Sequence, residues 1–242
     1  MRADKYLVDH GFFDTRARAQ EAIAAGLVRV DGEPVRKPSQ KIPDGAQIEA
    51  EAAHPWVSRA ALKLVEALDR FGIDPAGQVC LDVGASTGGF TEVLLERGAA
   101  RVHAVDVGRD QLHPRLRGEP RVVSMEARDA RSLTPADLPD PPTLIVCDAS
   151  FISLEKVIPV PLSLAAEGAA FIGLIKPQFE VGREGIGKGG LVRSDEIARA
   201  AVQRVTASLE GMAGFQRIGE VIESPITGGD GNREYLIAAR KG

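Results

Sequence analysis

The sequence holds few of the residues that build disulfide frameworks or metal centres. Two cysteines and four histidines occur among its 242 residues, and none of them stands at the spacing of a zinc site or a disulfide motif. Cys80 and Cys147 both lie inside apolar runs that are typical of buried strands. We therefore predict no metal site and two reduced thiols in the core of a cytoplasmic protein.

Long apolar runs and a secretion signal are also missing. Apolar stretches such as residues 169–175 are far shorter than the about 20 residues that cross a bilayer, and the N-terminus is charged where a signal peptide is apolar. With 44% hydrophobic and 26% charged residues, the composition is that of a globular protein with a buried core. A membrane partner is not expected. The net charge of −4 still permits a local basic patch.

Differences in residue pattern along the chain predict a small α+β domain over residues 1–52, a linker over 53–58 and a larger α/β domain over 59–242. In the small domain, Thr15 is placed to cap a helix that Gly26 ends. The Asp31-Gly32 pair between two apolar stretches predicts a tight hairpin. Two short helices, this hairpin and a last strand near residues 46–50 complete the predicted module.

Basic residues of the small domain gather where its helices begin. Residues 1–41 hold eight Lys or Arg and six Asp or Glu, so the excess of positive charge is small. Four of the basic residues lie at or near the predicted helix starts, where backbone N–H groups already favour phosphate: Arg2, Lys5, Arg16 and Arg18. Their placement predicts a nucleic-acid contact, with an ordinary solvated surface as the alternative.

The stretches "RADKYL" and "TRARAQEAIAAGLVRVDG" resemble the S4 RNA-binding domain. The resemblance covers nearly the whole small domain. It implies binding to a structured RNA element that is recognised by its shape and phosphates.

In the larger domain, apolar β-like runs alternate with helical patterns. This alternation predicts a mainly parallel, doubly wound sheet with right-handed crossovers. The last two of seven runs are joined only by "TGGDGNR", which predicts an antiparallel hairpin at the edge of the sheet. Ser194 is placed to cap the most regular helix, whose apolar stripe ends before Gly214.

The stretch "DVGASTGGFT" over residues 82–91 follows a predicted strand and opens a helix, where nucleotide-like ligands meet such sheets. Its glycine spacing differs from the dinucleotide fingerprint G-x-G-x-x-G. Asp82 would repel a pyrophosphate and attract an ammonium group, which favours S-adenosyl-L-methionine over a dinucleotide. Asp106 is placed for the ribose hydroxyls and Asp129 for the adenine edge. A tight turn without a ligand is the alternative.

The predicted cofactor contacts lie in three segments that follow successive strands, together with the residue that ends the fourth. They are Asp82, Gly84, Ala85, Ser86, Thr87, Gly88, Gly89, Phe90, Thr91, Asp106, Val107, Arg128, Asp129 and Asp148.

Sequence features also bear on the methyl acceptor. The fourth strand ends in "CDASFISL", which lacks the Pro-Pro-aromatic box of base N-methyltransferases, and Cys147 is poorly placed as a nucleophile for carbon methylation. An oxygen acceptor such as a ribose 2′-hydroxyl needs help in losing its proton. Two lysines and two acids are predicted near the sheet's carboxyl edge: Lys63, Asp148, Lys176 and Glu234. We predict that Lys176 lies closest to the hydroxyl. It would either remove the proton of the hydroxyl as a base or orient the lone pair of its oxygen. Surface positions for these residues are the alternative.

The motifs "SRAALKL", "LDVGASTGGFTEVLL", "CDASFISL", "IKPQFEVG" and "GNREYL" resemble the FtsJ-type 2′-O-methyltransferases and their Lys-Asp-Lys-Glu tetrad. Together with the S4 module, the whole chain resembles the TlyA family of ribosomal RNA cytidine-2′-O-methyltransferases, also labelled haemolysins. The resemblance implies a Rossmann-like S-adenosylmethionine-dependent methyltransferase whose partner is ribosomal RNA or a ribosomal subunit. Because the sequence stops at Gly242 without an extension, 23S rRNA is expected rather than 16S rRNA. Thr87 departs from the FtsJ pattern, in which proline is usual.

Further RNA contacts are predicted at Arg59, Arg183 and Lys188. The last two lie in a glycine-rich stretch, residues 180–196, which we expect to form a mobile loop over the site.

Two other functions are the alternatives to an RNA methyltransferase. A membrane-active haemolysin would need a long apolar span or a basic amphipathic helix, and the sequence has neither. A non-catalytic RNA-binding ribosome assembly factor would not need the tetrad. The oligomeric state is not predicted.

Overall fold

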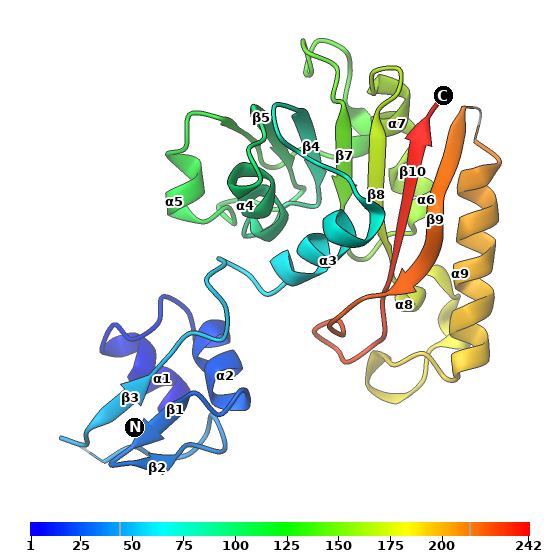
Figure 1. Ribbon diagram of the computed structural model, residues 1–242. Helices are drawn as coiled ribbons and strands as arrows, with labels where there is room; N and C mark the ends of the chain where they lie inside the picture. Colours follow the sequence, from blue (N-terminus) through cyan, green and yellow to red (C-terminus); the bar gives the residue numbers. More distant parts are fainter. Residues whose placement is uncertain (44, 213) are drawn as a thin grey trace. The chain divides into compact units, whose positions relative to one another are not determined.

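The chain divides after Trp56 into two units, Met1–Trp56 and Val57–Gly242 (Figure 1). This computed structural model describes residues 1–43, 45–212 and 214–242. Residues of the predicted linker take part in both units: the carbonyl of His54 accepts a hydrogen bond from Arg18 in the first unit, and the N–H of Val57 donates to Glu92 in the second. Among the described residues, no helix combines the length and apolar content needed to cross a membrane.

The first unit is a small α+β module. Its three strands pair antiparallel in the order β2-β1-β3. Asp31 and Gly32 both have positive φ, 52° and 80°, as a two-residue hairpin turn requires, so the predicted hairpin is confirmed. Thr15 accepts a hydrogen bond from the N–H of Arg18 at 3.3 Å, which confirms the predicted cap. The elements are α1 (Ala3–Asp9), α2 (Arg16–Ala24), β1 (Val28–Val30), β2 (Glu33–Pro34) and β3 (Ile48–Ala50).

A buried carboxylate organises the helix starts of this unit. Asp4 is fully buried. It accepts hydrogen bonds from Arg2 at 3.0 Å, Arg16 at 2.7 Å and Gln20 at 2.8 Å. The two arginines that the sequence assigned to RNA are therefore already bonded to an internal acid, although about half of each side chain remains exposed.

We expect Asp4→Asn to lower the stability of the first unit at neutral pH. Hydrogen bonds from Arg2 and Arg16 hold the pKa of Asp4 well below its usual range. A carboxyl group whose pKa is lower in the folded than in the unfolded state stabilises the fold. This contribution is complete at pH values above the unfolded pKa of about 4 and is lost as the pH falls toward the folded pKa. The Asn variant should lack this acid-dependent component. Amide hydrogen exchange of residues 1–56 between pH 3 and 7 measures both effects. The exposed Asp9→Asn is the control, and equal protection in the two variants would contradict the prediction.

The second unit contains a seven-stranded sheet in the order β6-β5-β4-β7-β8-β10-β9. The first five strands of this order pair in parallel, whereas β10 is antiparallel to both β8 and β9. The predicted mainly parallel sheet with an antiparallel edge hairpin is confirmed. The strands are β4 (Val79–Val83), β5 (Arg101–Val105), β6 (Val122–Met125), β7 (Leu144–Cys147), β8 (Ala170–Ile175), β9 (Phe215–Glu223) and β10 (Tyr235–Lys241).

Helices cover both faces of this sheet (Figure 1). On one face, α6, α7 and α9 pack over a core that includes Leu81, Ile145 and Phe171, while α3 and α4 cover the other. The central strands are accordingly buried on both sides, as in other parallel sheets. The helices are α3 (Ala61–Phe71), α4 (Gly89–Glu96), α5 (Pro114–Arg117), α6 (Leu154–Val157), α7 (Pro159–Leu164), α8 (Pro177–Glu180) and α9 (Asp195–Glu210).

Two connections show how local chemistry determines the elements. Ser194 accepts a hydrogen bond from the N–H of Ile197 at 3.3 Å, and Ala201, Val205 and Leu209 are buried, so the predicted capped helix is confirmed. Between β6 and β7 the described residues form only the 3₁₀ turn η1 (Ala130–Ser132). The prolines of "TPADLPDPP" that follow disfavour a longer helix there.

The sheet topology brings one set of chain segments to a common edge. Parallel strands β4, β5, β7 and β8 end on the same side of the sheet. Because β10 runs antiparallel to β8, its first residue Tyr235 lies opposite Ile175, the last residue of β8. The residue before β10 therefore lies beside the residues that follow β7 and β8.

Candidate active site

The turn after β4 requires glycine. Gly84 has a φ of +82°, and a Cβ added to it would lie 2.8 Å from Ala149 Cα and 2.9 Å from Ala149 N. The backbone of the segment after β7 therefore packs directly against this turn. Gly88, with φ +95°, faces the side chains of Leu112 and Leu116. The glycines of "DVGASTGG" thus serve close backbone packing as well as conformation.

A cavity of about 570 Å³ opens beside this turn at the carboxyl edge of the sheet. Seven of the predicted cofactor residues line it: Gly84, Ser86, Asp106, Val107, Arg128, Asp129 and Asp148. Ala85, Thr87, Gly89 and Phe90 instead line a smaller cavity of about 200 Å³. Asp82, Gly88 and Thr91 line neither of these two cavities. The cofactor role of all these residues stays a prediction.

The carboxylates at the ends of β5 and β6 already have partners. Asp106 accepts hydrogen bonds from the N–H of Ser86 at 2.8 Å and of Gly108 at 2.7 Å, so it joins the glycine turn to the next loop. Asp129 forms an ion pair with Arg131 at 2.6 Å, and the hydrogen bonds from Arg131 hold the pKa of Asp129 below its usual range. Both side chains line the large cavity.

Asp82 lies behind the glycine turn and is fully buried. Its Oδ2 accepts a hydrogen bond from Thr91 Oγ1 at 2.7 Å, whereas its Oδ1 has no hydrogen-bond partner within the described parts of the chain. Burial raises the pKa of Asp82 to about 7, and the neighbouring carboxylates of Asp148 and Asp106 act in the same direction. A cationic group in the adjoining cavity would favour the ionised form.

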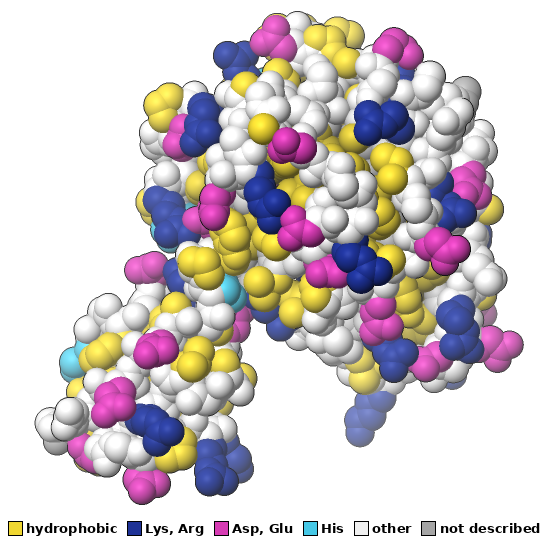
Figure 2. Space-filling view, in the orientation of Figure 1, with side chains coloured by type: hydrophobic (Ala, Val, Ile, Leu, Met, Phe, Trp, Pro, Cys, Tyr) yellow, Lys and Arg dark blue, Asp and Glu magenta, His cyan; other side chains and the backbone are white. Residues whose placement is uncertain are grey.

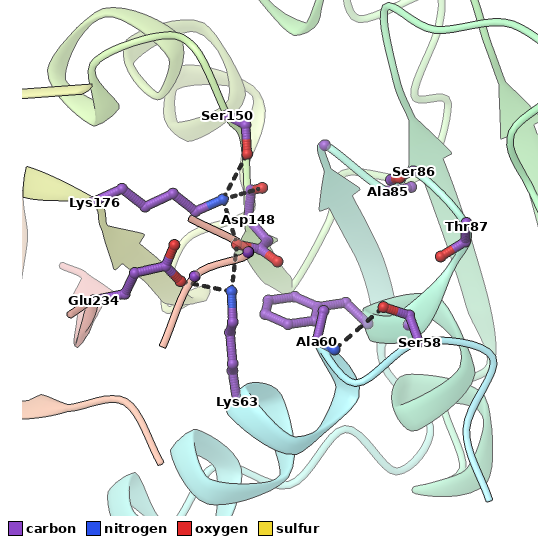
Figure 3. A pocket seen from close by; sticks show the side chains of 15 residues that line it. Ser58, Ala60, Lys63, Ala85, Ser86, Thr87, Asp148, Ser150, Lys176 and Glu234 are labelled. Atoms are coloured by element: carbon purple, nitrogen blue, oxygen red, sulfur yellow. Dashed lines mark hydrogen bonds and ion pairs between the residues drawn. The ribbon is translucent and has the colours of Figure 1, made fainter. Parts of the chain in front are cut away.

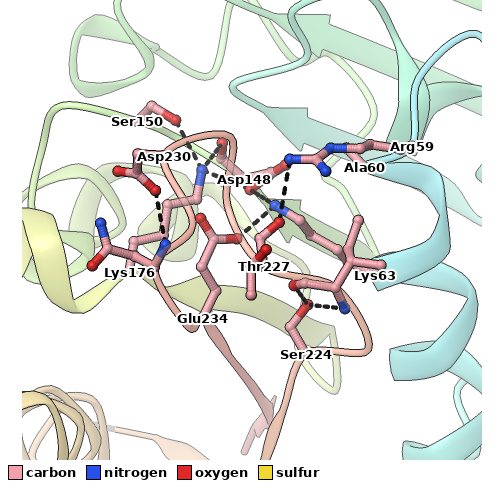
Figure 4. A network of polar contacts seen from close by, with 12 residues as sticks. Arg59, Ala60, Lys63, Asp148, Ser150, Lys176, Ser224, Thr227, Asp230 and Glu234 are labelled. Carbon is pink, nitrogen blue, oxygen red and sulfur yellow. Dashed lines mark hydrogen bonds and ion pairs between the residues drawn. The ribbon is translucent and has the colours of Figure 1, made fainter. Parts of the chain in front are cut away.

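The four residues of the predicted tetrad form one connected cluster (Figures 3 and 4). Lys63 Nζ lies 2.6 Å from Glu234 Oε2 and 3.5 Å from Asp148 Oδ1. Lys176 Nζ lies 2.7 Å from the same Oδ1. Lys63, Lys176 and Glu234 are each at least 94% buried. Two ammonium groups and two carboxylates therefore compensate each other in a site with little solvent, where an unpaired charge would be costly.

Each tetrad residue is positioned by the element next to it. Asp148 and Lys176 directly follow β7 and β8, and Glu234 directly precedes β10. Lys63 lies in the first turn of α3, and its side chain points at Glu234 and Asp148 (Figure 3). The juxtaposition thus follows from strand order and from the antiparallel direction of β10.

Ser150 completes the surroundings of Lys176 and was not predicted from the sequence. Lys176 Nζ donates to Ser150 Oγ at 2.9 Å and to the carbonyl oxygen of Asp148 at 2.9 Å. With the carboxylate of Asp148, three acceptors surround the three N–H groups of one ammonium. Its place two residues after Asp148 is the only sequence signal for Ser150.

A third cavity of about 450 Å³ adjoins the tetrad. Phe151, Phe179 and Glu234 are among its lining residues. Phe151 is 90% exposed and has a φ of +64°, and its ring centroid lies 5.2 Å from that of Phe179. A positive φ at a bulky residue is rare, and such strained positions cluster at functional sites. Phe151 also lines the 570 Å³ cavity, and the sequence reading missed it.

Other lining residues of the 570 Å³ cavity were missed as well. Gly108, Gln111, Ala149 and Ile152 line it, and all four lie in the loops after β5 and β7. Their proximity to Asp106 and Asp148 was the available signal.

The glycine-rich stretch that was expected to be mobile adopts short ordered turns in the structure. It contains the 3₁₀ turns η2 (Arg183–Gly185) and η3 (Lys188–Gly190) and an antiparallel bridge between Ile186 and Val192. Asn232 holds it, donating to the carbonyl of Gly190 and accepting from the N–H of Val192, both at 2.9 Å. A role as a lid on RNA binding stays a prediction.

The predicted RNA-binding residues differ in their surroundings. Lys5, Arg183 and Lys188 are exposed. Arg18 donates to the carbonyl of His54 at 3.2 Å and is only 16% exposed. Arg59 donates to the carbonyl of Thr227 at 3.4 Å, beside the tetrad (Figure 4). On the face seen in Figure 2, basic and acidic side chains are interspersed over the first unit and form no continuous basic patch there.

The two cysteines are chemically inert at neutral pH. Both are buried, and burial raises the pKa of the Cys80 and Cys147 thiols to about 12. Neither thiolate is available as a nucleophile. This agrees with the expectation that Cys147 does not take part in carbon methylation.

The sheet order, the glycine turn and the cavity at its carboxyl edge define a Rossmann-like methyltransferase. The O-methyltransferase of Bacillus cereus, solved in complex with SAH, has the same fold, with a TM-score of 0.54 over 98% of this chain and 96% of that one. At 18% identity, this likeness concerns the fold alone.

The chain belongs to the FtsJ-like methyltransferase family, whose sequence model matches residues 56–241; the S4 domain model matches residues 1–48. It is 45% identical over 241 residues to the "16S/23S rRNA (cytidine-2'-O)-methyltransferase TlyA" of Mycobacterium tuberculosis (strain ATCC 25618 / H37Rv), covering 99% of this chain and 89% of the relative. A solved structure described as "Putative hemolysin from Streptococcus thermophilus" is 40% identical, with a TM-score of 0.78 over 100% of this chain and 88% of that one. The predicted family is confirmed.

Proposed function

We propose that the protein transfers a methyl group from S-adenosyl-L-methionine to the ribose 2′-hydroxyl of a cytidine in ribosomal RNA. We place the reaction in the cytoplasm, with rRNA or a ribosomal subunit as partner and 23S rRNA preferred over 16S rRNA. The Lys63–Glu234 and Lys176–Asp148 pairs, whose four residues all line the 200 Å³ cavity, carry the proposal. The 45% identity to a relative named for both rRNAs supports the substrate class.

The residues around the glycine turn suit this cofactor. The 570 Å³ cavity has room for a nucleoside with an amino-acid tail. Asp106 is placed for ribose hydroxyls. Asp82 lies behind the glycine turn without lining the cavity, and its ionised form would favour an amine over a phosphate nearby. When bound, S-adenosyl-L-methionine supplies an electrophilic methyl group. Gly84, Asp106 and Asp129 would hold it.

The tetrad would orient the hydroxyl and accept its proton. Three acceptors already surround the three N–H groups of Lys176, so the incoming 2′-oxygen would replace Ser150 Oγ as one of them. In this role Lys176 orients the hydroxyl and does not act as a neutral base. Methylation turns the hydroxyl into an ether, so its proton must leave. Asp148 lines both the 570 Å³ cavity and the 200 Å³ cavity, and the other three tetrad residues also line the smaller one. Its carboxylate is therefore the one best placed to take the proton of the hydroxyl that Lys176 orients, while the methyl–sulfur bond of the donor breaks and leaves a neutral thioether. Lys63 and Glu234 hold Asp148 in position.

The 450 Å³ cavity would receive the acceptor base. A 2′-hydroxyl that reaches Lys176 must belong to a nucleotide turned out of its helix, and enzymes stabilise such bases by stacking on aromatic rings. Phe151 and Phe179 offer such rings next to Glu234.

We expect Phe151→Ala to lower kcat/KM for rRNA by about 5-fold to 150-fold, because base–aromatic stacking contributes about 1–3 kcal/mol. Phe151→Trp should retain most of the activity. Steady-state methylation with RNA as the varied substrate measures this. Val123→Ala, at an exposed apolar residue of the outer strand β6, is the control. Equal activity of the Ala variant and wild type would remove Phe151 from the acceptor site.

The function itself is tested with purified protein, tritiated cofactor and unmodified rRNA, small subunits and large subunits. We expect label at one or a few cytidines, with the modified ribose resistant to alkaline cleavage. Label on a base would contradict the 2′-oxygen as acceptor. RNA binding without incorporation would instead favour the non-catalytic assembly factor. Comparison of the two subunits tests the preference for 23S rRNA.

A further inference from the structure

We propose that Glu180 is a positioning residue that holds the loop between β7 and α6 in the shape that methyl transfer needs. This loop, residues 148–153, carries Asp148, Ser150 and Phe151. The inference rests on the proposed function and adds to it a residue that contacts neither the cofactor cavity nor the acceptor cavity.

The carboxylate of Glu180 binds the end of this loop directly. Its Oε1 accepts the N–H of Leu154 at 2.8 Å, and its Oε2 accepts the hydroxyl of Ser153 at 2.7 Å. The side chain is only 1% exposed. Ser153, although it is the N-cap residue of α6, makes no side-chain cap of its own. A carboxylate from α8 therefore takes the place of the missing cap, where negative charge is favoured.

Fixing residues 153 and 154 constrains Phe151. The loop is anchored at its start by the packing of Ala149 on Gly84 and by the Ser150–Lys176 hydrogen bond. At its end, Leu154 is buried in the core. A φ of +64° at an exposed phenylalanine is unfavourable and persists only when its flanks are held. The Glu180 carboxylate supplies the second of the two anchors.

Glu180 also connects the two walls of the acceptor cavity. It follows Phe179 directly in α8, and α8 begins one residue after Lys176. The 5.2 Å separation of the Phe151 and Phe179 rings therefore depends on a bond between their two segments. The Glu180 contacts with Ser153 and Leu154 join these segments at one end, as the Lys176–Ser150 hydrogen bond joins them at the other.

Arg204 of α9 compensates the buried charge. Its Nη2 lies 3.3 Å from Glu180 Oε2 and donates to the carbonyl of Glu180 at 3.0 Å. Arg204 also pairs with Glu155, which is partly exposed and lies on α6. Glu155 shares Arg204 with Glu180 and lies 3.5 Å from the hydroxyl of Ser153, but it does not bind the N–H of Leu154. Glu155→Ala therefore controls for the loss of the Arg204 pair and of a contact with Ser153.

We expect Glu180→Ala to lower kcat/KM for rRNA by about 10-fold to 100-fold, as a displaced reacting group does. Glu180→Gln should recover part of the loss because its amide oxygen can still accept from Leu154. Glu155→Ala should retain near-normal activity. Activity of Glu180→Ala equal to that of Glu155→Ala would overturn the proposal.

A double-mutant cycle separates positioning from general destabilisation. If Glu180 acts through Phe151, Glu180→Ala should cost little in a Phe151→Ala background. An equal loss in both backgrounds would overturn the proposal.

A readout without activity distinguishes failure of the positioning role from failure of the proposed function. Amide hydrogen exchange at residues 149–154 should be faster in Glu180→Ala than in Glu155→Ala, while β7 and β8 stay protected. Unchanged exchange would refute the positioning role even in an active enzyme. An inactive wild type with the expected exchange would instead contradict the proposed function alone.

Discussion

Replacing Lys176 by alanine should reduce methyl transfer to rRNA by about 10²-fold to 10⁴-fold, the range that a positioned proton-transfer group contributes. Within the tetrad, Lys176 Nζ contacts both Asp148 and Ser150. Asp148 and Ser150 line the cofactor cavity, whereas Lys176 does not. Single-turnover rates should therefore fall, while the affinity for S-adenosyl-L-methionine changes little.

The control for this loss is Lys156→Ala, which removes an exposed lysine from α6 and should leave the rate unchanged. Removing one partner of a buried ion pair also costs stability, so melting temperatures of both variants are measured alongside. Lys176→Met, which keeps the volume without the charge, should be as slow as Lys176→Ala. Full activity of either Lys176 variant would exclude a catalytic role for this residue.

The second large effect is expected at the glycine turn. In Gly84→Ala the new Cβ would overlap the backbone of Ala149, at 2.8 Å from its Cα, in a conformation with φ +82°. Strain of the left-handed backbone and overpacking together cost about 2–5 kcal/mol. The turn must shift, and with it the cavity wall formed by Gly84 and Ala149. We expect affinity for S-adenosyl-L-methionine to fall by roughly 30-fold or more.

Gly98 offers a matched control for this substitution. Its φ is +86°, almost that of Gly84, but a Cβ there would meet Ala76 at an ordinary 3.6 Å. Gly98→Ala therefore carries the backbone strain without the overlap, and it should lower stability but not cofactor affinity. Isothermal titration of both variants separates the two causes. Equal affinities for both variants would show that the close approach to Ala149 is not needed for binding.

Much of the fold could be predicted because its signals are local. The hairpin at Asp31-Gly32, the caps at Thr15 and Ser194 and the alternation of strands with helices each depend on residues adjacent in sequence. The tetrad could also be predicted from the sequence. Asp148, Lys176 and Glu234 adjoin predicted strand ends, and a doubly wound sheet brings such ends together at one edge.

Other features depend on contacts between distant segments. The sequence could not show that Asp4 is buried and binds Arg2 and Arg16, so these arginines were read as open RNA contacts. The left-handed conformation of Phe151 and the bond from Glu180 to Leu154 have no periodic signature. They arise only when α8 packs beside α6.

By itself, the sequence determined the two-part organisation, the strand–helix alternation and the four ionisable residues of the tetrad, because hydrophobic periodicity and turn chemistry act over a few residues. Only the tertiary structure decided which of these residues pair and where the acceptor cavity opens. The reason is physical: Lys63 and Glu234 lie 171 residues apart in the chain, and their 2.6 Å contact exists only because β10 inserts antiparallel beside β8 and excludes water from the charges that it brings together.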